Sequence, residues 1–502
     1  MTEQSNHIND QKTASFDKSV SLNMALNIIR TLLSVVFPLI TYPYVTRILG
    51  VDNFGKVSYS QSIINYFTLI AGLGISSYAI REGGVQRTNR ESIDSFASQL
   101  FSMNLFFTLL AYGLLGVLLL FSAKVQNYRI LLLILSLSML FTTIGVDWIN
   151  VIFEDYLYIT VRSFLIQLLT IVLLFVFVKS KDDYYRYAFL TVSGNALIAI
   201  SNFVYTRRYC KIKITTRINA RQHIKPTLIL FSNSIAVTVY SSVDSVMLGF
   251  FTDDYCVGIY AVAVRVYTIL KQLVAAVYTV TVTRLTAFVA RKDNDAYQSL
   301  LDTIINNIIV ISIPIVIGMV CISKSVVTTL AGSEYQDSSF ALSILSLTIS
   351  FSVLGGAIAY CVNLPHKKEK NNLISTVIGA VENFLLNIWA IPHLKVAGAA
   401  YTTLISETTV FIILFFSIKS YWHLFDKKSI FKNVIKCLVS CIPFVILVRL
   451  YLFWIPENSF VYLICSLTTI IILYLVTNLL LRNKYLFNLI KDVTNRIKRN
   501  CK

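Results

Sequence analysis

Residues 23–46, NMALNIIRTLLSVVFPLITYPYVT, form an apolar run that is long enough to cross a lipid bilayer as one helix. A helix rises about 1.5 Å per residue, so about 20 apolar residues span the hydrocarbon core. Arg30 lies inside this run, directly after Ile28 and Ile29. An arginine at mid-membrane costs about 2.5–3.5 kcal/mol on insertion scales, which makes Arg30 a candidate functional residue.

The whole chain has the composition of a protein that crosses the membrane many times. Of its 502 residues, 56% are hydrophobic and 14% are charged, whereas average soluble domains carry about 25% charged residues. The formal net charge of +18 comes mostly from basic residues in short loops and at the C-terminus. This placement is typical of the cytoplasmic face of a membrane protein, so we expect a membrane environment and no nucleic-acid partner.

Cysteine and histidine positions indicate no metal or disulfide framework. Of the eight cysteines, Cys437 and Cys441 lie four residues apart, but in an apolar run where cysteine acts as a small hydrophobic residue. No histidine lies deep in an apolar run, and the first twenty residues lack the apolar segment of a signal peptide. We therefore expect no cofactor, no metal site and no cleaved leader.

Windows of about 20 apolar residues predict an all-α chain with about fourteen transmembrane helices. Their approximate limits are 22–46, 57–79, 95–121, 128–150, 155–178, 184–205, 227–251, 256–288, 297–321, 337–362, 371–391, 396–418, 431–453 and 459–481.

The distribution of basic residues predicts the orientation of these helices. With the N-terminus in the cytoplasm, the alternate loops on that side carry most of the lysines and arginines, including the stretches 81–90 and 206–226 and a basic tail, 482–502. Cytoplasmic loops of membrane proteins carry such an excess. Both termini are therefore predicted to be cytoplasmic.

The longest internal loop divides the predicted helices into two sets of six. This loop, residues 206–226, is basic and contains no acidic residue. No loop is large enough for a soluble catalytic domain, so we expect a protein that is not an enzyme. The predicted organisation is a cytoplasmic tail (1–21), an N-lobe (22–205), the basic linker (206–226), a C-lobe (227–418), helices thirteen and fourteen (431–481) and the basic tail (482–502).

A short motif recurs at equivalent places in the two halves. RILGVDNFGKVSYSQSI follows the first span and VMLGFFTDDYCVGIYAVAVRV ends the seventh. Each contains a Leu-Gly pair, at Gly50 and Gly249, and a second glycine, Gly55 and Gly258, before the next helix. Glycine ends a helix in the left-handed region and allows a tight turn. An even number of helices separates the motifs, which predicts parallel repeats.

Polar side chains follow helical spacing in the first two spans of each half. Such stripes line a water-filled cavity or form hydrogen-bonded seams between helices, and their recurrence in both halves favours a cavity. The charge of these stripes is mainly cationic, and arginine suits phosphate because its planar fork of donors stays charged. The candidate substrate-binding residues are Asn27, Arg30, Ser34, Gln61, Asn65, Arg265, Lys271 and Gln272.

Three acidic residues within the predicted spans are candidates for coupling transport to an ion. Asp244 lies in the seventh span, and Glu382 and Glu407 lie near the middle of the eleventh and twelfth. Carboxylates inside a membrane are rare and can carry protons or cations. Two structural alternatives stay open: Arg30 or Arg265 could pair with Asp244, and the glutamates could hydrogen-bond to neighbouring helices.

Two stretches carry a resemblance to a known family. YVTRILGVDNFGKVSYSQSIINYFTLIAGLGISSYAIRE, residues 44–82, and IPHLKVAGAAYTTLISE, residues 391–407, resemble the O-antigen and capsule repeat-unit flippases of the Wzx type. These belong to the multidrug/oligosaccharidyl-lipid/polysaccharide exporter superfamily. The resemblance covers about residues 20 to 420, and the last two spans depart from the twelve-span pattern that is common in the family.

The resemblance implies a bilobed transporter in polysaccharide or lipopolysaccharide biosynthesis. Its substrate would be an undecaprenyl-pyrophosphate-linked oligosaccharide, moved across the cytoplasmic membrane by alternating access. Arg30 and Arg265 would meet the pyrophosphate from facing lobes, and the polar stripes would receive the sugar. A polysaccharide polymerase and a chain-length protein are the further partners that such a function allows.

Three other functions compete with this interpretation. A flippase for lipid-linked peptidoglycan precursors shares the superfamily and also receives a pyrophosphate, so the arginines do not distinguish it. A multidrug exporter of the same fold would need an acidic or aromatic cavity for cationic drugs. A polytopic glycosyltransferase or polymerase would need a catalytic loop outside the membrane, and the predicted outer loops are short.

Overall fold

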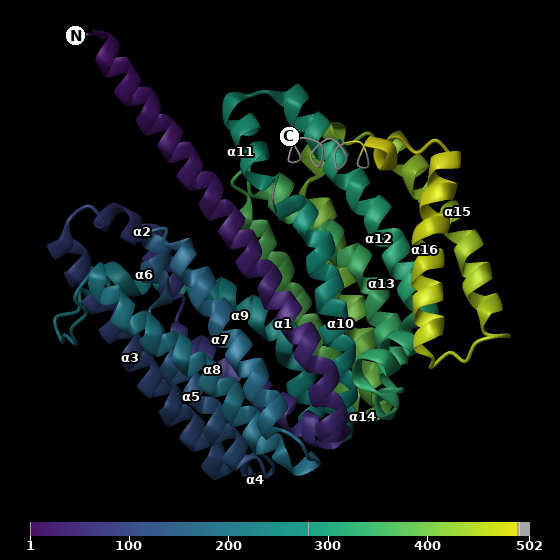
Figure 1. The fold of residues 1–502 in the computed structure, drawn as a ribbon, viewed down its shortest axis with the longest axis horizontal. Helices are drawn as coiled ribbons and strands as arrows, with labels where there is room; N and C mark the ends of the chain where they lie inside the picture. Colours follow the sequence, from purple (N-terminus) through teal and green to yellow (C-terminus); the bar gives the residue numbers. More distant parts are fainter. Residues whose placement is uncertain (1, 280, 489–490, 492–502) are drawn as a thin grey trace. The chain divides into compact units, whose positions relative to one another are not determined.

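The computed structural model describes the backbone of residues 2–279, 281–488 and 491. It describes the side chains of these residues except for 2–25, 27–32, 34, 35, 220, 221, 233, 236 and 241. All regular elements within this described part are helices, as Figure 1 shows, so the prediction of an all-α chain is confirmed.

The helices are long and apolar enough for many membrane crossings. Within the described residues, eleven helices pass this test, and the bent pair Gln222–Tyr240 and Ser242–Phe251 makes twelve if it is one span. Two of the eleven, Val36–Gln86 and Glu369–Ser417, have 51 and 49 residues, about twice what one crossing requires. Each contains a break in the helix. Counted as two crossings each, they bring the described chain to about fourteen, as predicted.

The chain forms two compact units, which we call the N-terminal unit (residues 1–238) and the C-terminal unit (residues 239–502). The boundary lies inside α9 (Ala220–Phe251), close to the 50° bend between its two parts. The first part of α9 thus belongs with the helices that precede it, and the second part with those that follow.

The N-terminal unit is a bundle in which α1 packs against α3, α5 and α7, and α8 packs against α5 and α7. Its elements are α1 (Thr2–Gly72), α2 (Ile75–Gln86), α3 (Arg90–Phe121), α4 (Ala123–Gln126), α5 (Arg129–Gly145), α6 (Asp147–Ile152), α7 (Tyr156–Phe177), η1 (Lys181–Asp183), α8 (Tyr184–Tyr205), η2 (Thr206–Arg208) and the first part of α9.

The two Leu-Gly pairs of the predicted repeat differ in conformation. Gly50 interrupts α1 as the sequence predicts, with φ at 71° and ψ at 175°, an extended conformation of positive φ that is almost restricted to glycine and differs from the predicted left-handed helical one. Gly249 lies inside α9, which continues to Phe251, so the prediction that it ends a helix in the same way is wrong. The turn is made instead at Asp253, whose carboxylate accepts the Cys256 N–H at 2.9 Å and caps α10. That hydrogen bond lowers the pKa of Asp253 below its ordinary value.

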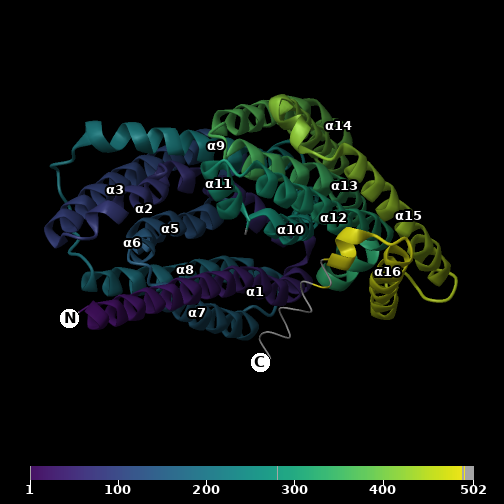
Figure 2. The same cartoon turned by 90° about the horizontal axis from the view of Figure 1, so that it is seen from above.

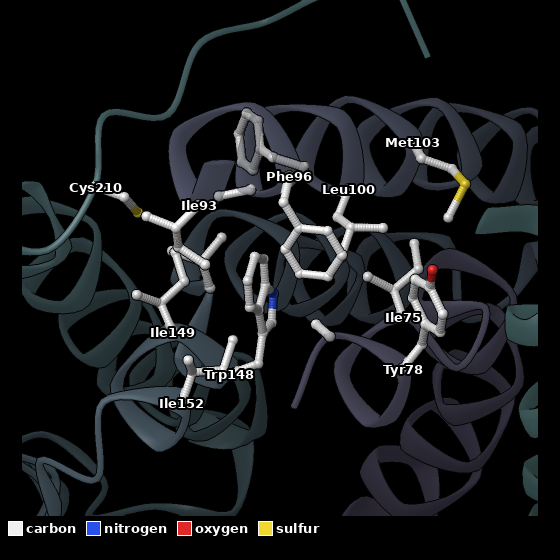
Figure 3. Packing of buried hydrophobic residues seen from close by; sticks show 14 of the residues in the cluster. Ile75, Tyr78, Ile93, Phe96, Leu100, Met103, Trp148, Ile149, Ile152 and Cys210 are labelled. Atoms are coloured by element: carbon white, nitrogen blue, oxygen red, sulfur yellow. The ribbon is translucent and has the colours of Figure 1, made fainter. Parts of the chain in front are cut away.

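Large apolar side chains from α2, α3 and α6 form a hydrophobic cluster at one end of the N-terminal unit (Figure 3). Phe96 and Trp148 are 7% and 4% exposed, and Tyr78, Ile149 and Ile152 pack with them. Burial of each such side chain stabilises the fold by about 1.5–3 kcal/mol. Because α2 and α6 are short, this cluster is what holds them against α3.

The segment after η2, within the predicted basic linker, is bound along α3 in an extended conformation. The Lys211 N–H donates to Asp94 Oδ1 at 2.8 Å, and those of Lys213 and Thr215 donate to the hydroxyl groups of Ser98 and Ser102 at 3.0 and 2.9 Å. Four residues of helix and two of extended chain both advance about 6–7 Å, so the two repeats match. This register fixes the linker to the N-terminal unit.

The C-terminal unit is organised around α12, which packs against α10, α13, α15 and α16. Its elements after α9 are α10 (Asp254–Thr279), α11 (Val282–Arg291), α12 (Asn294–Ala331), η3 (Ser333–Tyr335), α13 (Ser338–Ala357), the π-helix η4 (Ile358–Asn363), α14 (Glu369–Ser417), η5 (Lys419–Leu424), α15 (Lys427–Tyr451) and α16 (Phe460–Leu480).

The last two helices, α15 and α16, pack against each other in both views (Figures 1 and 2) and against α12. Four buried asparagines connect the three helices. Asn433 Nδ2 donates to Asn306 Oδ1 at 2.9 Å, and Asn483 Nδ2 donates to Asn433 and Asn478 at 2.9 and 2.8 Å. Amide groups inside an apolar bundle have no water to bond, so this network fixes how the pair is seated on α12.

The sharp turn inside α14 explains the glycine of the stretch IPHLKVAGAAYTTLISE. The helix is interrupted at Lys395, which has φ at 50°, and its two parts approach closely at Gly398. A Cβ atom on Gly398 would lie 2.4 Å from the carbonyl oxygen of Ala390. Only glycine therefore fits, and the close approach brings the second part of α14 back beside the first.

Candidate functional site

Three helices of the C-terminal unit, α9, α10 and α14, carry polar and charged side chains at membrane depth. Two of the acids are almost fully buried, with Asp244 at 6% and Glu407 at 5% exposure. The structure brings together the side chains of Asp244, Tyr260, Tyr267, Lys271, Glu382, Asn383, Asn387, Thr402, Thr403, Glu407 and Thr409 through the hydrogen bonds given below.

Asp244 is the centre of one hydrogen-bonded group. Its Oδ2 accepts from the hydroxyl groups of Tyr260 at 2.6 Å and Thr403 at 2.7 Å, and its Oδ1 accepts from Asn387 Nδ2 at 2.6 Å. The Asn387 amide is itself oriented by Asn383 at 3.0 Å and Thr402 at 2.6 Å. Residues from α10 and both parts of α14 therefore hold this carboxylate of α9 in place.

The partners of Asp244 are neutral. Among the described residues, this carboxylate forms hydrogen bonds and no ion pair, so the alternative in which Arg265 pairs with it is not realised in this structure. A buried carboxylate without a cationic partner gains stability from a proton or a small cation. The surrounding amide and hydroxyl oxygens are groups that can share in binding either one.

Glu407 forms a second group with α10. Its Oε1 accepts from Lys271 Nζ at 2.9 Å and from the Tyr267 hydroxyl at 3.2 Å. The Lys271 ammonium also lies 5.6 Å from the centre of the Tyr267 ring, within the range of a cation–π interaction. The two partners differ in exposure: the Lys271 side chain is 35% exposed and that of Glu407 is 6% exposed.

Glu382 has a less complete set of partners. Its Oε1 accepts from the Thr409 hydroxyl at 3.2 Å, while its Oε2 is buried without a hydrogen bond in the described residues. The hydroxyl of Tyr240 is also buried and without such a bond there, and it lies within electrostatic range of Asp244, Glu382 and Glu407. The three acids predicted to couple ions thus all lie within electrostatic range of one tyrosine.

Arg265 lies in α10, six residues before Lys271, and forms no ion pair among the described residues. Its Nε is buried and has no hydrogen-bond partner in that part of the chain. Gln272 is exposed on the same helix. A guanidinium donor of this kind is chemically able to form a charge-assisted hydrogen bond with an anion.

The candidate residues of the N-terminal unit are only partly described. Gln61 Nε2 donates to Asn65 Oδ1 at 2.9 Å, one helical turn away in α1, and Asn65 is exposed. The side chains of Asn27, Arg30 and Ser34 lie outside the described residues.

Several residues of the Asp244 group did not emerge from the sequence reasoning. Tyr260, Asn383, Asn387, Thr402 and Thr403 are ordinary polar residues within apolar runs. The available signal is the spacing of Asn383 and Asn387, which places two amides on one face of a helix. The identity of their acidic partner depends on how α9 packs against α14, which no local pattern encodes.

Comparison with known sequences gives a family and several relatives. Residues 20–288 match the family described as "Polysaccharide biosynthesis protein". A "Putative O-antigen transporter" of Shigella dysenteriae is 21% identical over 391 residues, which cover 76% of this chain and 96% of that protein. One of Escherichia coli (strain K12) with the same description is 22% identical over 388 residues, covering 75% and 91%.

Comparison with solved structures gives the same fold in two kinds of transporter. The chain is similar to a lipid II flippase MurJ in an inward closed conformation, with a TM-score of 0.75 and 19% identity, covering 92% of this chain and 99% of that one. An inward-facing multidrug resistance MATE family transporter has a TM-score of 0.57 and 16% identity, covering 78% and 96%. At these identities the likeness shows a shared fold.

Proposed function

Since the chain belongs to the polysaccharide biosynthesis protein family, we propose that it is a flippase for lipid-linked oligosaccharides, of the Wzx type. Its substrate would be an undecaprenyl-pyrophosphate-linked repeat unit of O-antigen or capsule, moved across the cytoplasmic membrane. The relatives described as O-antigen transporters support this substrate class, because the match spans most of both chains.

The observation that carries the proposal is the cationic character of α10. Arg265, with its unused buried donor, and Lys271, with its partly exposed ammonium, lie on one helix at membrane depth. Cationic side chains at membrane depth are energetically costly and generally mark a functional site. A pyrophosphate carries several negative charges and accepts hydrogen bonds from both kinds of side chain.

The lobes and the orientation predicted from sequence complete this proposal. Two six-helix lobes would alternate between inward- and outward-open states, with Arg30 of the N-lobe meeting the pyrophosphate opposite Arg265. Asn27, Ser34, Gln61, Asn65 and Gln272 would line the path of the sugar. Both termini would be cytoplasmic, which agrees with the basic residues of the 206–226 loop and the 482–502 tail. A polymerase and a chain-length protein would act on the product.

Ion coupling is the second element of the proposal. We assign Asp244, Glu382 and Glu407 to it, because all three lie in one unit and within electrostatic range of Tyr240. Asp244 has the most complete set of oxygen- and nitrogen-bearing neighbours, and Glu382 has an oxygen without a partner among the described residues. Either carboxylate could exchange a proton or a cation during the cycle.

The competing functions have weaker support. The similarity to MurJ is compatible with a peptidoglycan-precursor flippase, and the similarity to the MATE transporter is compatible with a multidrug exporter. Both similarities show a shared fold, and neither identifies a substrate. A cationic drug would be repelled by Arg265, which has no acidic partner among the described residues. A glycosyltransferase or polymerase would require a catalytic loop for which the short connections leave little room.

The experiment that tests the proposal is transport in reconstituted vesicles. The protein is inserted into liposomes with an undecaprenyl-pyrophosphate-linked oligosaccharide, and the fraction that moves to the other leaflet is followed with a lectin or a membrane-impermeant hydrolase. Transport that depends on the protein and falls in Arg30→Ala and Arg265→Ala supports the proposal. Wild-type transport in both variants would remove the arginines from the site. A wild type that is inactive with and without an ion gradient would reject this substrate.

A further inference from the structure

The two side chains of the Lys271–Glu407 ion pair differ in their exposure. A purely structural ion pair does not require such a difference. The ammonium and carboxylate are 2.9 Å apart, yet the lysine is about six times as exposed as the glutamate. An anion beside α10 can therefore contact the exposed part of Lys271, whereas Glu407 has almost no exposed surface to offer and accepts from Tyr267. Lysine is a compact charge on a long stem, so its ammonium can change partner without moving the backbone.

If Lys271 turns toward another anion, Glu407 loses its only cationic partner among the described residues. The Tyr267 hydroxyl would remain as a neutral donor at 3.2 Å. Glu407 is only 5% exposed, so its ionised carboxylate is strongly destabilised when the lysine ammonium leaves. Protonation of the carboxylate removes this unpaired buried charge.

Among the described residues, no second cation forms an ion pair with Glu407 that could replace the lysine. Tyr267 of α10 donates a hydrogen bond to Glu407, and Tyr240 of α9 and Tyr278 of α10 lie within electrostatic range of it. Glu382, on the first part of α14, lies within the same range of Tyr240. The tyrosines are neutral, and Glu382 adds negative charge. Both conditions favour a proton on Glu407 once Lys271 has left.

We propose that Glu407 is an internal counter-anion of Lys271, that the diphosphate of the substrate displaces it, and that the displaced carboxylate takes up one proton. This inference rests on the proposed function, because it takes the diphosphate from there. Charge is balanced at each step: the ammonium keeps its protons and exchanges a carboxylate oxygen for a phosphate oxygen, and the proton on Glu407 comes from bulk water. Binding of substrate is thereby linked to proton uptake inside the C-terminal unit.

The test uses farnesyl diphosphate, a soluble isoprenoid diphosphate, as the probe, and farnesol as the probe without charge. Binding to the full-length protein in detergent is measured by titration calorimetry at pH 7.5 in two buffers of different ionisation enthalpy. The difference gives the protons taken up per ligand, and the Glu407→Gln variant gives the reference for protons exchanged by the probe itself. We expect the wild type to take up about one proton more than this variant.

The variants separate the roles of the two residues. Glu407→Gln should bind the diphosphate as tightly as the wild type or about tenfold more tightly, because the competing carboxylate is gone. Lys271→Met should bind it at least about tenfold more weakly. The double variant, Lys271→Met with Glu407→Gln, buries no unpaired charge and should show the same weak binding, which excludes misfolding as its cause. Glu369→Gln, at the exposed start of α14, is the control and should keep the proton uptake of the wild type.

Three results would overturn the inference. They are equal proton uptake in the wild type and Glu407→Gln, weaker binding by Glu407→Gln, and no binding of farnesyl diphosphate by the wild type. Vesicle transport then decides the proposed function separately. A wild type that moves the lipid-linked oligosaccharide without extra proton uptake leaves the flippase proposal intact, and one that does not move it removes both.

Discussion

The Asp244 carboxylate on α9 accepts a hydrogen bond from the Asn387 amide on α14 at 2.6 Å, across 143 residues of sequence. Both side chains are buried, and Tyr260 and Thr403 donate to the other oxygen of the same carboxylate. One acid therefore joins three helices of the C-terminal unit, and its removal should affect both folding and transport.

Replacing Asp244 by alanine should destabilise the protein by about 2–3 kcal/mol, because it leaves buried donors of Tyr260, Thr403 and Asn387 without an acceptor. Asp244→Asn keeps an acceptor oxygen and should cost less while abolishing any dependence of transport on an ion gradient. Thermal unfolding in detergent and vesicle transport measure the two effects. An Asp244→Asn variant whose transport responds to the gradient as the wild type does would exclude Asp244 from coupling.

Replacing Arg265 by alanine should reduce transport by about tenfold or more, because it removes a charge-assisted donor to the pyrophosphate. Arg265→Lys keeps the charge but not the planar fork, so it should retain part of the activity. The rate of lipid movement in vesicles is the measurement, and Arg291→Ala, on the exposed end of α11, is the control. An equal loss of transport in Arg291→Ala would show that the total positive charge of the protein, and not the position of Arg265, sets the rate.

Replacing Gly398 by alanine should destabilise the fold by about 1–3 kcal/mol, because the new Cβ would lie 2.4 Å from the Ala390 carbonyl oxygen. Gly116→Ala is the matched control, since a Cβ there meets nothing within 4 Å. It should leave stability unchanged or raise it slightly, as glycine is a poor helix former. Melting temperatures of the two variants in the same detergent decide this, and equal values would mean that α14 adjusts its turn.

Replacing Asn433 by leucine should loosen α15 and α16 from α12, because Asn306 and Asn483 both lose their partner at this position. The buried amides left behind cost about 1–3 kcal/mol. Limited proteolysis of the connection that precedes α15 should become faster than in the wild type. Lys432→Ala, at the neighbouring exposed position, is the control and should be cleaved at the wild-type rate.

The stability of the N-terminal unit should depend on pH through Asp155, which lies between α6 and α7. Burial opposes ionisation of this carboxyl, but hydrogen bonds from Tyr209 at 2.5 Å and Tyr205 at 2.7 Å outweigh it and hold its pKa below the ordinary value. A lowered pKa in the folded state stabilises the fold at pH values above about 4 and stops doing so as the pH falls through the lowered value. The melting temperature between pH 3 and pH 7 should therefore depend less on pH in Tyr209→Phe than in the wild type.

Much of the fold follows from local sequence. Apolar runs of about 20 residues identify the crossings, because no polar backbone group survives unpaired in lipid and a helix pairs all of them. The same local reasoning predicts a helix break at Gly50, and the structure has one there, at a positive φ of 71°. The prediction of a helix end at Gly249 is wrong, because α9 continues to Phe251. The turn follows a few residues later, where Asp253 caps the start of α10.

The pairing of the candidate site residues was decided by tertiary structure. The sequence shows that Asp244, Lys271, Glu382 and Glu407 lie at membrane depth, because each sits inside an apolar run. It does not show that Lys271 pairs with Glu407 while Asp244 bonds to neutral groups. These partners lie more than 130 residues apart, and their meeting depends on the rotation and crossing of α9, α10 and the folded-back α14, which only the packing of the whole unit sets.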